Sequence, residues 1–299
     1  MEQPRFVETG NNSLFGFGLQ MSKSRCSIEL YDKSETAILF CYNQYNEETM
    51  KEPFRSRLKK NETLLGTLVS LASLESAEIL AEAGFDWFFV DLEHSPLGPR
   101  EAQAVLQVAG ERVDCILRVP LNDEIWIKKA LDTGAAGVMV PQVNSAEEAR
   151  RAVRFSKYPP QGTRSLGASR AHGYGPRLQE YIERANTETA VIVQIEHIDA
   201  VRNLEAIIST EGIDGVLVGP YDLSASMGHI GQIENVEVQA AIAHVRQVCL
   251  ESGMPLGIFA ATAERARGYL QEGYRLIAAS GDILMLTSAA RQVVDQLKG

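Results

Sequence analysis

The chain has 299 residues, 45% of them apolar and 23% charged, and a net charge of −10 at pH 7. This is the composition of an ordinary globular protein, and its negative balance argues against a nucleic-acid surface. A short basic run at residues 55–60 is interpreted as a solvated face. The sequence has no run of 18 apolar residues and a polar start, so we expect a cytoplasmic protein. The four cysteines lack CxxC spacing, which argues against a disulfide framework and a zinc site.

Residues 1–53 are predicted to form an N-terminal extension with weak or peripheral structure. Residues 28–31 and 37–41 have the composition of short strands, but the polar sequence around them leaves little to bury. Met50 is itself a plausible start for the folded unit. One hypothesis is therefore that residues 1–49 have no catalytic importance.

From residue 54 to residue 299, short apolar runs alternate with amphipathic stretches, which predicts strands and helices in turn. The predicted strands are residues 64–70, 87–91, 114–119, 137–140, 190–196, 215–218, 255–259 and 274–279. Helices are predicted after each strand, for example at 73–83, 125–133, 146–155, 236–251 and 282–297. Glycines that suit the left-handed conformation just past a helix end occur at Gly84, Gly134, Gly212, Gly253 and Gly273.

Eight strand–helix units in one chain are typical of a (β/α)₈ TIM barrel of the α/β class, although a doubly wound sheet stays open as an alternative. In a barrel the active site lies at the carboxyl ends of the strands, so the side chains there are the candidates for chemistry. Such residues gather at four predicted strand ends, as Asp91 and His94, Arg118, Gln194 and Glu196, and Tyr221 and Asp222.

Glu196 and Asp222, two of the carboxylates among these residues, come after buried strands of β-branched character. Glu196 closes the run Ala-Val-Ile-Val, and Asp222 follows Gly-Val-Leu-Val. A carboxylate at the end of such a strand has no solvated face and needs a partner. Because oxygen ligands favour Mg²⁺ or Mn²⁺ over zinc, the pair predicts a site for a hard divalent metal. Arg118 would add a fixed positive charge, and His94 a group that titrates near neutral pH.

Together these motifs resemble the HpcH/HpaI aldolase family over residues 54–299. The matching segments are Asp-Leu-Glu-His at 91–94, Leu-Arg-Val-Pro at 117–120, Val-Pro-Gln at 140–142, Gln-Ile-Glu at 194–196, and 215–224. The resemblance implies a class II, metal-dependent aldolase that acts on pyruvate-type 2-oxo acids. It also implies a TIM barrel whose C-terminal helix packs against a neighbouring subunit of a homo-oligomer, either a trimer or a hexamer.

The resemblance further implies roles at the site. Glu196 and Asp222 would bind the divalent metal, which would be Mg²⁺, Mn²⁺ or Co²⁺. His94 would be the proton-accepting base, and Arg118 would stabilise the developing negative oxygen. The reaction would be the reversible cleavage of a 4-hydroxy-2-oxo acid of the sugar-acid type. The base takes the C4 hydroxyl proton, the C3–C4 bond breaks, and an aldehyde leaves an enolate on the metal.

Other residues match supporting positions of the family. Asp132 matches the acidic residue that raises the basicity of the histidine, and Asp91 lies close enough in sequence to support the same ring. The positions that match the groups holding the oxo acid are Gln194 and the backbone amides of Tyr221 and Asp222.

Three alternative functions have less support in the sequence. A Schiff-base aldolase needs a lysine on a barrel strand, and no lysine here ends an apolar run. A CoA-ester lyase similar to the citrate lyase β subunit would share the barrel and the metal site, but its nucleotide needs a basic surface. A non-catalytic metal-binding scaffold is disfavoured, because nothing in the set of strand-end residues looks degraded.

The connection at residues 156–176 is too long for a routine loop and is expected over the site or at an interface. Arg164 and Arg170 within it would meet either a second carboxylate on an acidic aldehyde or a neighbouring chain. The part at residues 162–175 resembles the stretch seen in members of the family that act on sugar acids.

Overall fold

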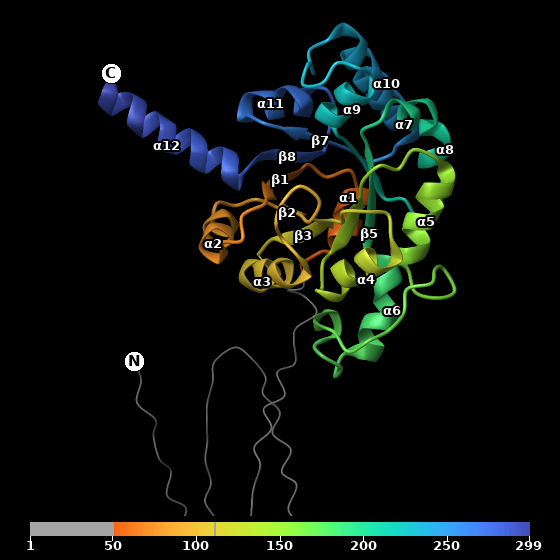
Figure 1. Cartoon of the computed structure of the whole chain (residues 1–299). Coiled ribbons are helices and arrows are strands. Elements are labelled where there is room, and N and C mark those ends of the chain that lie inside the picture. Colours follow the sequence, from red (N-terminus) through yellow and green to blue (C-terminus); the bar gives the residue numbers. More distant parts are fainter. Residues whose placement is uncertain (1–50, 111) are drawn as a thin grey trace, which may run out of the picture. The chain divides into compact units, whose positions relative to one another are not determined.

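Eight parallel strands close into a barrel that is surrounded by helices, in the computed structural model of the chain (Figure 1). The structure describes residues 51–110 and 112–299. The expectations for residues 28–31 and 37–41, and for the rest of the N-terminal extension, lie outside the described residues. Within the described residues, no helix is long and apolar enough to cross a membrane.

The strands follow one another around the barrel in chain order, and the last pairs with the first. They are β1 (Leu64–Val69), β2 (Trp87–Asp91), β3 (Asp114–Arg118), β4 (Gly137–Val140), β5 (Ala190–Ile195), β6 (Gly215–Val218), β7 (Leu256–Ala260) and β8 (Leu276–Gly281). Closure is set by the register of β1 on β8, in which Leu64 lies opposite Leu276. The predicted TIM barrel is therefore confirmed, and the doubly wound alternative is excluded.

Helices precede, separate and follow the strands, and most of them cover the outside of the barrel. They are α1 (Phe54–Lys59), α2 (Leu74–Glu82), α3 (Pro99–Ala109), α4 (Glu124–Asp132), α5 (Ala146–Ser156), α6 (Leu178–Glu188), α7 (Ile198–Arg202), α8 (Leu204–Ile208), α9 (Pro220–Ser226), α10 (Val236–Ser252), α11 (Ala263–Gln271) and α12 (Asp282–Lys298). Side chains of Ser73, Asp123 and Ser145 cap α2, α4 and α5 by accepting hydrogen bonds from first-turn amides. The five glycines predicted at helix ends all have positive φ.

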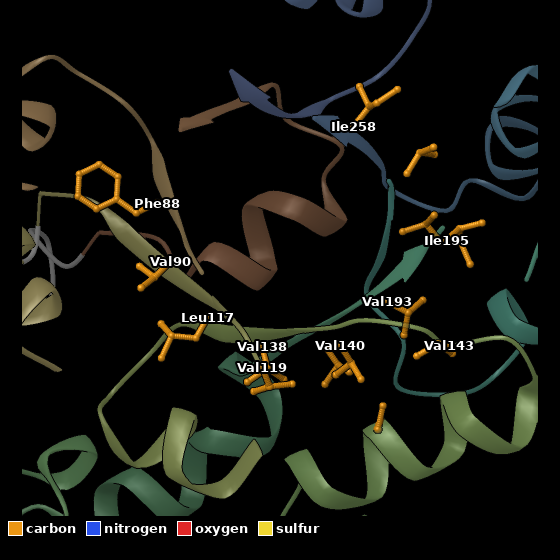
Figure 2. Packing of buried hydrophobic residues seen from close by; sticks show 14 of the residues in the cluster. Phe88, Val90, Leu117, Val119, Val138, Val140, Val143, Val193, Ile195 and Ile258 are labelled. Atoms are coloured by element: carbon orange, nitrogen blue, oxygen red, sulfur yellow. The ribbon is translucent and has the colours of Figure 1, made fainter. Parts of the chain in front are cut away.

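The alternating side chains of the strands build two separate cores. Outward-facing residues such as Leu117, Val138 and Val193 pack towards the surrounding helices (Figure 2). Inward-facing residues fill the barrel interior, where Trp87 lies against Phe54 and Phe89. The barrel is thus a packed core at its amino-terminal end, and space for a ligand remains at the other end.

Helix α1 closes the amino-terminal end of the barrel, which corrects the interpretation of residues 55–60 as a solvated face. Its Phe54 and Leu58 are buried in the inner core. Arg55 donates to Asp214 at 2.7 Å, and Arg57 donates to Asp86 at 2.8 Å. The basic residues of α1 therefore fix this helix to the amino ends of strands, rather than leaving a free positive surface.

The long connection between α5 and α6 packs far from the carboxyl ends of the strands. Arg164 is fully buried and donates to Asp132 at 2.9 Å, while Arg170 donates to the carbonyl of Thr133 at 2.7 Å. Asp132 and Thr133 end α4 and lead into the amino end of β4. Within a single chain, the expectation that this connection lies over the site is therefore wrong. The expectation that Arg164 and Arg170 bind substrate there is wrong for the same reason.

Helix α12 projects away from the barrel (Figure 1). Its first residue, Asp282, is buried and accepts hydrogen bonds from the backbone amides of Ser70 and Leu71 at 2.9 and 2.8 Å. Along the helix, apolar side chains such as Leu286 and Leu297 are exposed. The packing of this helix against a neighbouring subunit stays a prediction.

We predict that Leu58→Ala lowers the free energy of unfolding by about 2–5 kcal/mol, because it opens a cavity in the inner core at a residue that is 1% exposed. The matched control is Ile79→Ala on α2, which removes an exposed apolar side chain and should change stability by less than about 0.5 kcal/mol. Urea unfolding measures both. Equal losses in the two variants would contradict the role of α1 as a buried plug.

Candidate active site

A cavity of about 160 Å³ lies at the carboxyl ends of the strands. It combines an apolar floor from the barrel interior with polar groups at the rim. Its lining residues are Leu68, Phe89, His94, Arg118, Gln194, Leu217, Gly219, Pro220, Tyr221, Asp222 and Phe259. Five of the residues predicted from sequence for catalysis, metal binding or substrate binding therefore share this cavity.

A buried ion pair joins the ends of β2 and β3 beside the cavity. Arg118 donates from Nε to Asp91 Oδ1 at 2.9 Å and from Nη2 to Asp91 Oδ2 at 2.7 Å. The guanidinium also lies over the Phe89 ring, 4.9 Å from its centroid. Two parallel hydrogen bonds and a ring contact leave the guanidinium little freedom. This pair holds the pKa of Asp91 below its ordinary value, against the opposing effect of burial.

Asp91 also fixes the chain that follows β2. Its Oδ1 accepts hydrogen bonds from the backbone amides of Glu93 and His94 at 3.0 and 3.3 Å. The His94 ring is mostly exposed at the mouth of the cavity, and its Nε2 lies 3.7 Å from Glu93 Oε2. Asp91 therefore supports the backbone that carries His94, whereas the predicted support was to the ring.

Glu196 follows β5 and is held by two glutamines. Gln142 donates to Glu196 Oε1 from its backbone N at 2.8 Å and from Nε2 at 3.0 Å. Gln194 Nε2 donates to the other carboxylate oxygen. Gln142 adopts a positive φ of 52°, which is uncommon for a residue other than glycine and aims its amide at the carboxylate. The Gln194 Oε1 atom is buried and accepts no hydrogen bond.

Asp222 reaches the cavity from the first turn of α9, directly after β6. The turn from β6 into α9 needs Gly219, because a Cβ there would come within 2.9 Å of both Gln194 Nε2 and Glu196 Cβ. Pro220 occupies the first helical position, where a missing N–H is tolerated. The glycine thus lets the carboxylate-bearing turn of α9 approach Glu196 closely.

The electrostatics of the site suit a cation. Burial, together with the charges of Glu93 and Asp222, raises the pKa of Glu196 to about 7, against the opposing effects of the backbone hydrogen bond from Gln142 and the charge of Arg118. Burial likewise raises the pKa of Glu93 to about 7. Within the described residues, no three His, Cys, Asp or Glu side chains are arranged to hold an ion by themselves. The donors that fit a hard divalent metal are the Glu196 and Asp222 carboxylates, with water or substrate completing its coordination.

One residue predicted for the site, Asp132, lies away from the cavity, and two residues that were not predicted, Gln142 and Glu93, lie beside it. Asp132 ends α4 at the amino-terminal side of the barrel and pairs with Arg164, so a single chain does not bring it to His94. Gln142 and Glu93 were not predicted as site residues. Both lie in matching segments of the family, directly after β4 and β2, and position at a strand end was the signal that could have found them.

The chain was compared with known proteins. The family model described as HpcH/HpaI aldolase/citrate lyase matches residues 65–289. A hydroxypyruvate/pyruvate aldolase of Paraburkholderia phytofirmans is 38% identical, covering 84% of this chain and 99% of that protein. A 2-dehydro-3,6-dideoxy-6-sulfogluconate aldolase of Pseudomonas putida is 42% identical, covering 81% and 95%. A solved HpcH/HpaI aldolase/citrate lyase family protein of Burkholderia cenocepacia superposes with a TM-score of 0.79 at 37% identity, covering 82% of this chain and 98% of that chain.

The raised pKa of Glu196 gives a pH test of the metal-free protein. The folded protein keeps this proton up to about pH 7, whereas the unfolded chain loses it near 4.5, so this group's contribution to stability falls as pH rises between these values. In Glu196→Gln the contribution is absent. We therefore expect the melting temperature of the wild type, relative to the variant, to fall between pH 5 and pH 7.5 in the presence of a chelator. Parallel pH curves for the two proteins would contradict the assignment.

Proposed function

This chain belongs to the HpcH/HpaI aldolase/citrate lyase family, and from that premise we propose that it is a class II aldolase. Its reaction is the reversible cleavage of a 4-hydroxy-2-oxo acid to a pyruvate-type 2-oxo acid and an aldehyde. The observation that carries this proposal is the convergence of His94, Arg118, Gln194 and Asp222 on one cavity, with Glu196 held behind them. The family match supports the carbon–carbon lyase class, and the site supports the roles.

We propose that Glu196 and Asp222 hold a divalent cation, of which Mg²⁺ and Mn²⁺ are the candidates. When bound, such an ion supplies a Lewis acid for the carbonyl oxygen of the 2-oxo acid. Arg118 lines the same cavity and would supply a fixed positive charge for the negative charge that develops on that oxygen. The bidentate pair with Asp91 keeps the guanidinium in place, so little reorganisation is needed during the reaction.

The oxo acid is oriented by groups of β5 and α9. The first-turn amides of Tyr221 and Asp222 precede the hydrogen-bonded part of α9, and such amides suit a substrate carboxylate. The unpartnered Oε1 of Gln194 accepts a hydrogen bond from the substrate or from water. His94, at the mouth of the cavity, takes the proton from the C4 hydroxyl in cleavage and then delivers it to C3 of the enolate that the broken C3–C4 bond leaves, which gives the methyl group of pyruvate. In condensation His94 takes the C3 proton and gives it to the aldehyde oxygen.

The Schiff-base aldolase and the CoA-ester lyase have less support than the class II aldolase. No lysine is among the described residues that line the cavity. Lys157 is buried, but it donates to the carbonyls of Asn186 and Thr189 before β5, at the opposite end of the barrel from a Schiff-base position. The curated relatives reported above carry the names of aldolases, which favours aldol cleavage over the lysis of CoA esters. The sugar-acid type of substrate, the homo-oligomer and the cytoplasmic location stay predictions.

We predict that the purified protein with Mn²⁺ or Mg²⁺ exchanges the methyl protons of pyruvate with solvent, because enolate formation is the step that the site is built to assist. Proton NMR in deuterated water measures the exchange. Glu196→Gln should lose metal binding and exchange together. His94→Ala should retain metal and slow exchange by about 10²- to 10⁴-fold, the usual contribution of a general base. No exchange by the wild type with either metal would overturn the proposed function.

We also propose that residues 54–299 are the catalytic unit. Support comes from the family match at residues 65–289 and from the relatives, whose nearly full length is covered by about four fifths of this chain. A chain that starts at Met50 should therefore fold and exchange pyruvate protons at the rate of the full-length protein. An inactive but folded chain from Met50 would count against this proposal.

A further inference from the structure

Glu93 is a third carboxylate beside the cavity, and neither the metal site nor the substrate contacts described above use it. Its side chain is only 15% exposed. Its Oε2 atom is buried and accepts no hydrogen bond, although it lies 3.2 Å from Arg118 Nε. A buried carboxylate oxygen without a hydrogen bond is costly, so such an atom in a site calls for a functional explanation.

The same oxygen faces the proposed base. Glu93 Oε2 lies 3.7 Å from His94 Nε2, slightly beyond hydrogen-bond distance. The His94 ring is 62% exposed, so it has room to close this gap by a small rotation. Glu93, by contrast, is held on the other side by the fixed guanidinium of Arg118. The backbone of both residues is fixed by Asp91, whose two carboxylate oxygens are already taken.

We propose that Glu93 is the positioning residue for His94, an inference that rests on the proposed function. Its Oε2 accepts a hydrogen bond from His94 Nε2–H, which orients the ring and leaves Nδ1 as the atom that accepts the substrate proton. The carboxylate then stabilises the imidazolium that forms. This is the role that sequence resemblance assigned to Asp132, which in a single chain is paired with Arg164 at the other end of the barrel.

The charges around Glu93 fit this role. Arg118 on β3 and Asp91 on β2 neutralise each other, while Asp222 on α9 and Glu196 after β5 add negative charge near Glu93. Together with burial, these carboxylates oppose ionisation of Glu93, and an imidazolium beside it favours its charged form. Histidine and glutamate thus stabilise each other at the moment when the proton is on the ring.

The test is a double-mutant cycle on pyruvate proton exchange with Mn²⁺, using wild type, Glu93→Gln, His94→Ala and the double variant. Removing an orienting partner typically costs about 10- to 100-fold, and we expect that loss in Glu93→Gln. In the His94→Ala background, Glu93→Gln should change the rate by no more than about twofold, because its effect passes through the ring. Glu93→Asp, which keeps the charge, should recover part of the rate.

Two further readouts separate positioning from a structural effect. Mn²⁺ affinity, measured by electron paramagnetic resonance, should be largely retained in Glu93→Gln and lost in Glu196→Gln, because Glu93 is not one of the two proposed metal ligands. The acid limb of the pH–rate profile should move to lower pH, because a histidine that loses a nearby negative charge has a lower pKa. Glu82→Gln makes the same chemical change on the exposed surface of α2 and should leave both rate and profile unaltered.

Equal losses from Glu93→Gln with and without His94 would overturn the inference, as would a wild-type rate, an unshifted profile or a loss of Mn²⁺ binding in Glu93→Gln. These results concern Glu93 alone whenever the wild type exchanges pyruvate protons. Absence of exchange in the wild type is a failure of the proposed function instead, so the two failures are distinguishable.

Discussion

The buried pair of Arg118 and Asp91 is the interaction on which the site depends. It joins the ends of β2 and β3, and through Asp91 Oδ1 it also fixes the backbone of Glu93 and His94. Two buried charges are expensive to desolvate, and removing one partner of such a pair typically costs about 3–5 kcal/mol. The protein therefore gives up some stability to hold one cation rigidly in the wall of the cavity. In the proposed reaction, that rigidity would keep the guanidinium in place while negative charge develops on the substrate oxygen.

Because Asp91 neutralises Arg118, the remaining charges of the site are unbalanced. Glu93, Glu196 and Asp222 are close enough to influence one another, and burial raises the pKa of the first two to about 7. Such a cluster favours a bound proton or a bound cation. In the proposed function, a divalent ion bound by Glu196 and Asp222 would relieve the repulsion, and an imidazolium at His94 would do the same for Glu93. The repulsion among these carboxylates is thus matched to the positive charges that the proposed reaction brings to them.

The strands and their ends could be predicted from the sequence, because the local pattern of apolar residues decides them. The strand ends at Asp91, Glu196 and Gly219 could be located because buried runs of aromatic or β-branched residues stop there. The observed bounds of β7 and β8 differ from the predicted ones by only one or two residues. The surroundings of single side chains could not be predicted in the same way, because contacts between distant parts of the chain decide them. Arg55 and Arg57 appear solvated in sequence, yet they pair with carboxylates at the amino ends of strands. Gln142 depends on a positive φ that no local motif indicates.

The most direct test of the account is a crystal structure of the protein soaked with Mn²⁺ and pyruvate, in which anomalous scattering locates the ion. The account predicts one strong peak bound by the carboxylates of Glu196 and Asp222, with the pyruvate keto oxygen on the Arg118 side of the cavity. A cavity without manganese, or manganese bound elsewhere while pyruvate occupies this cavity, would contradict the assignment of the two carboxylates as the metal site.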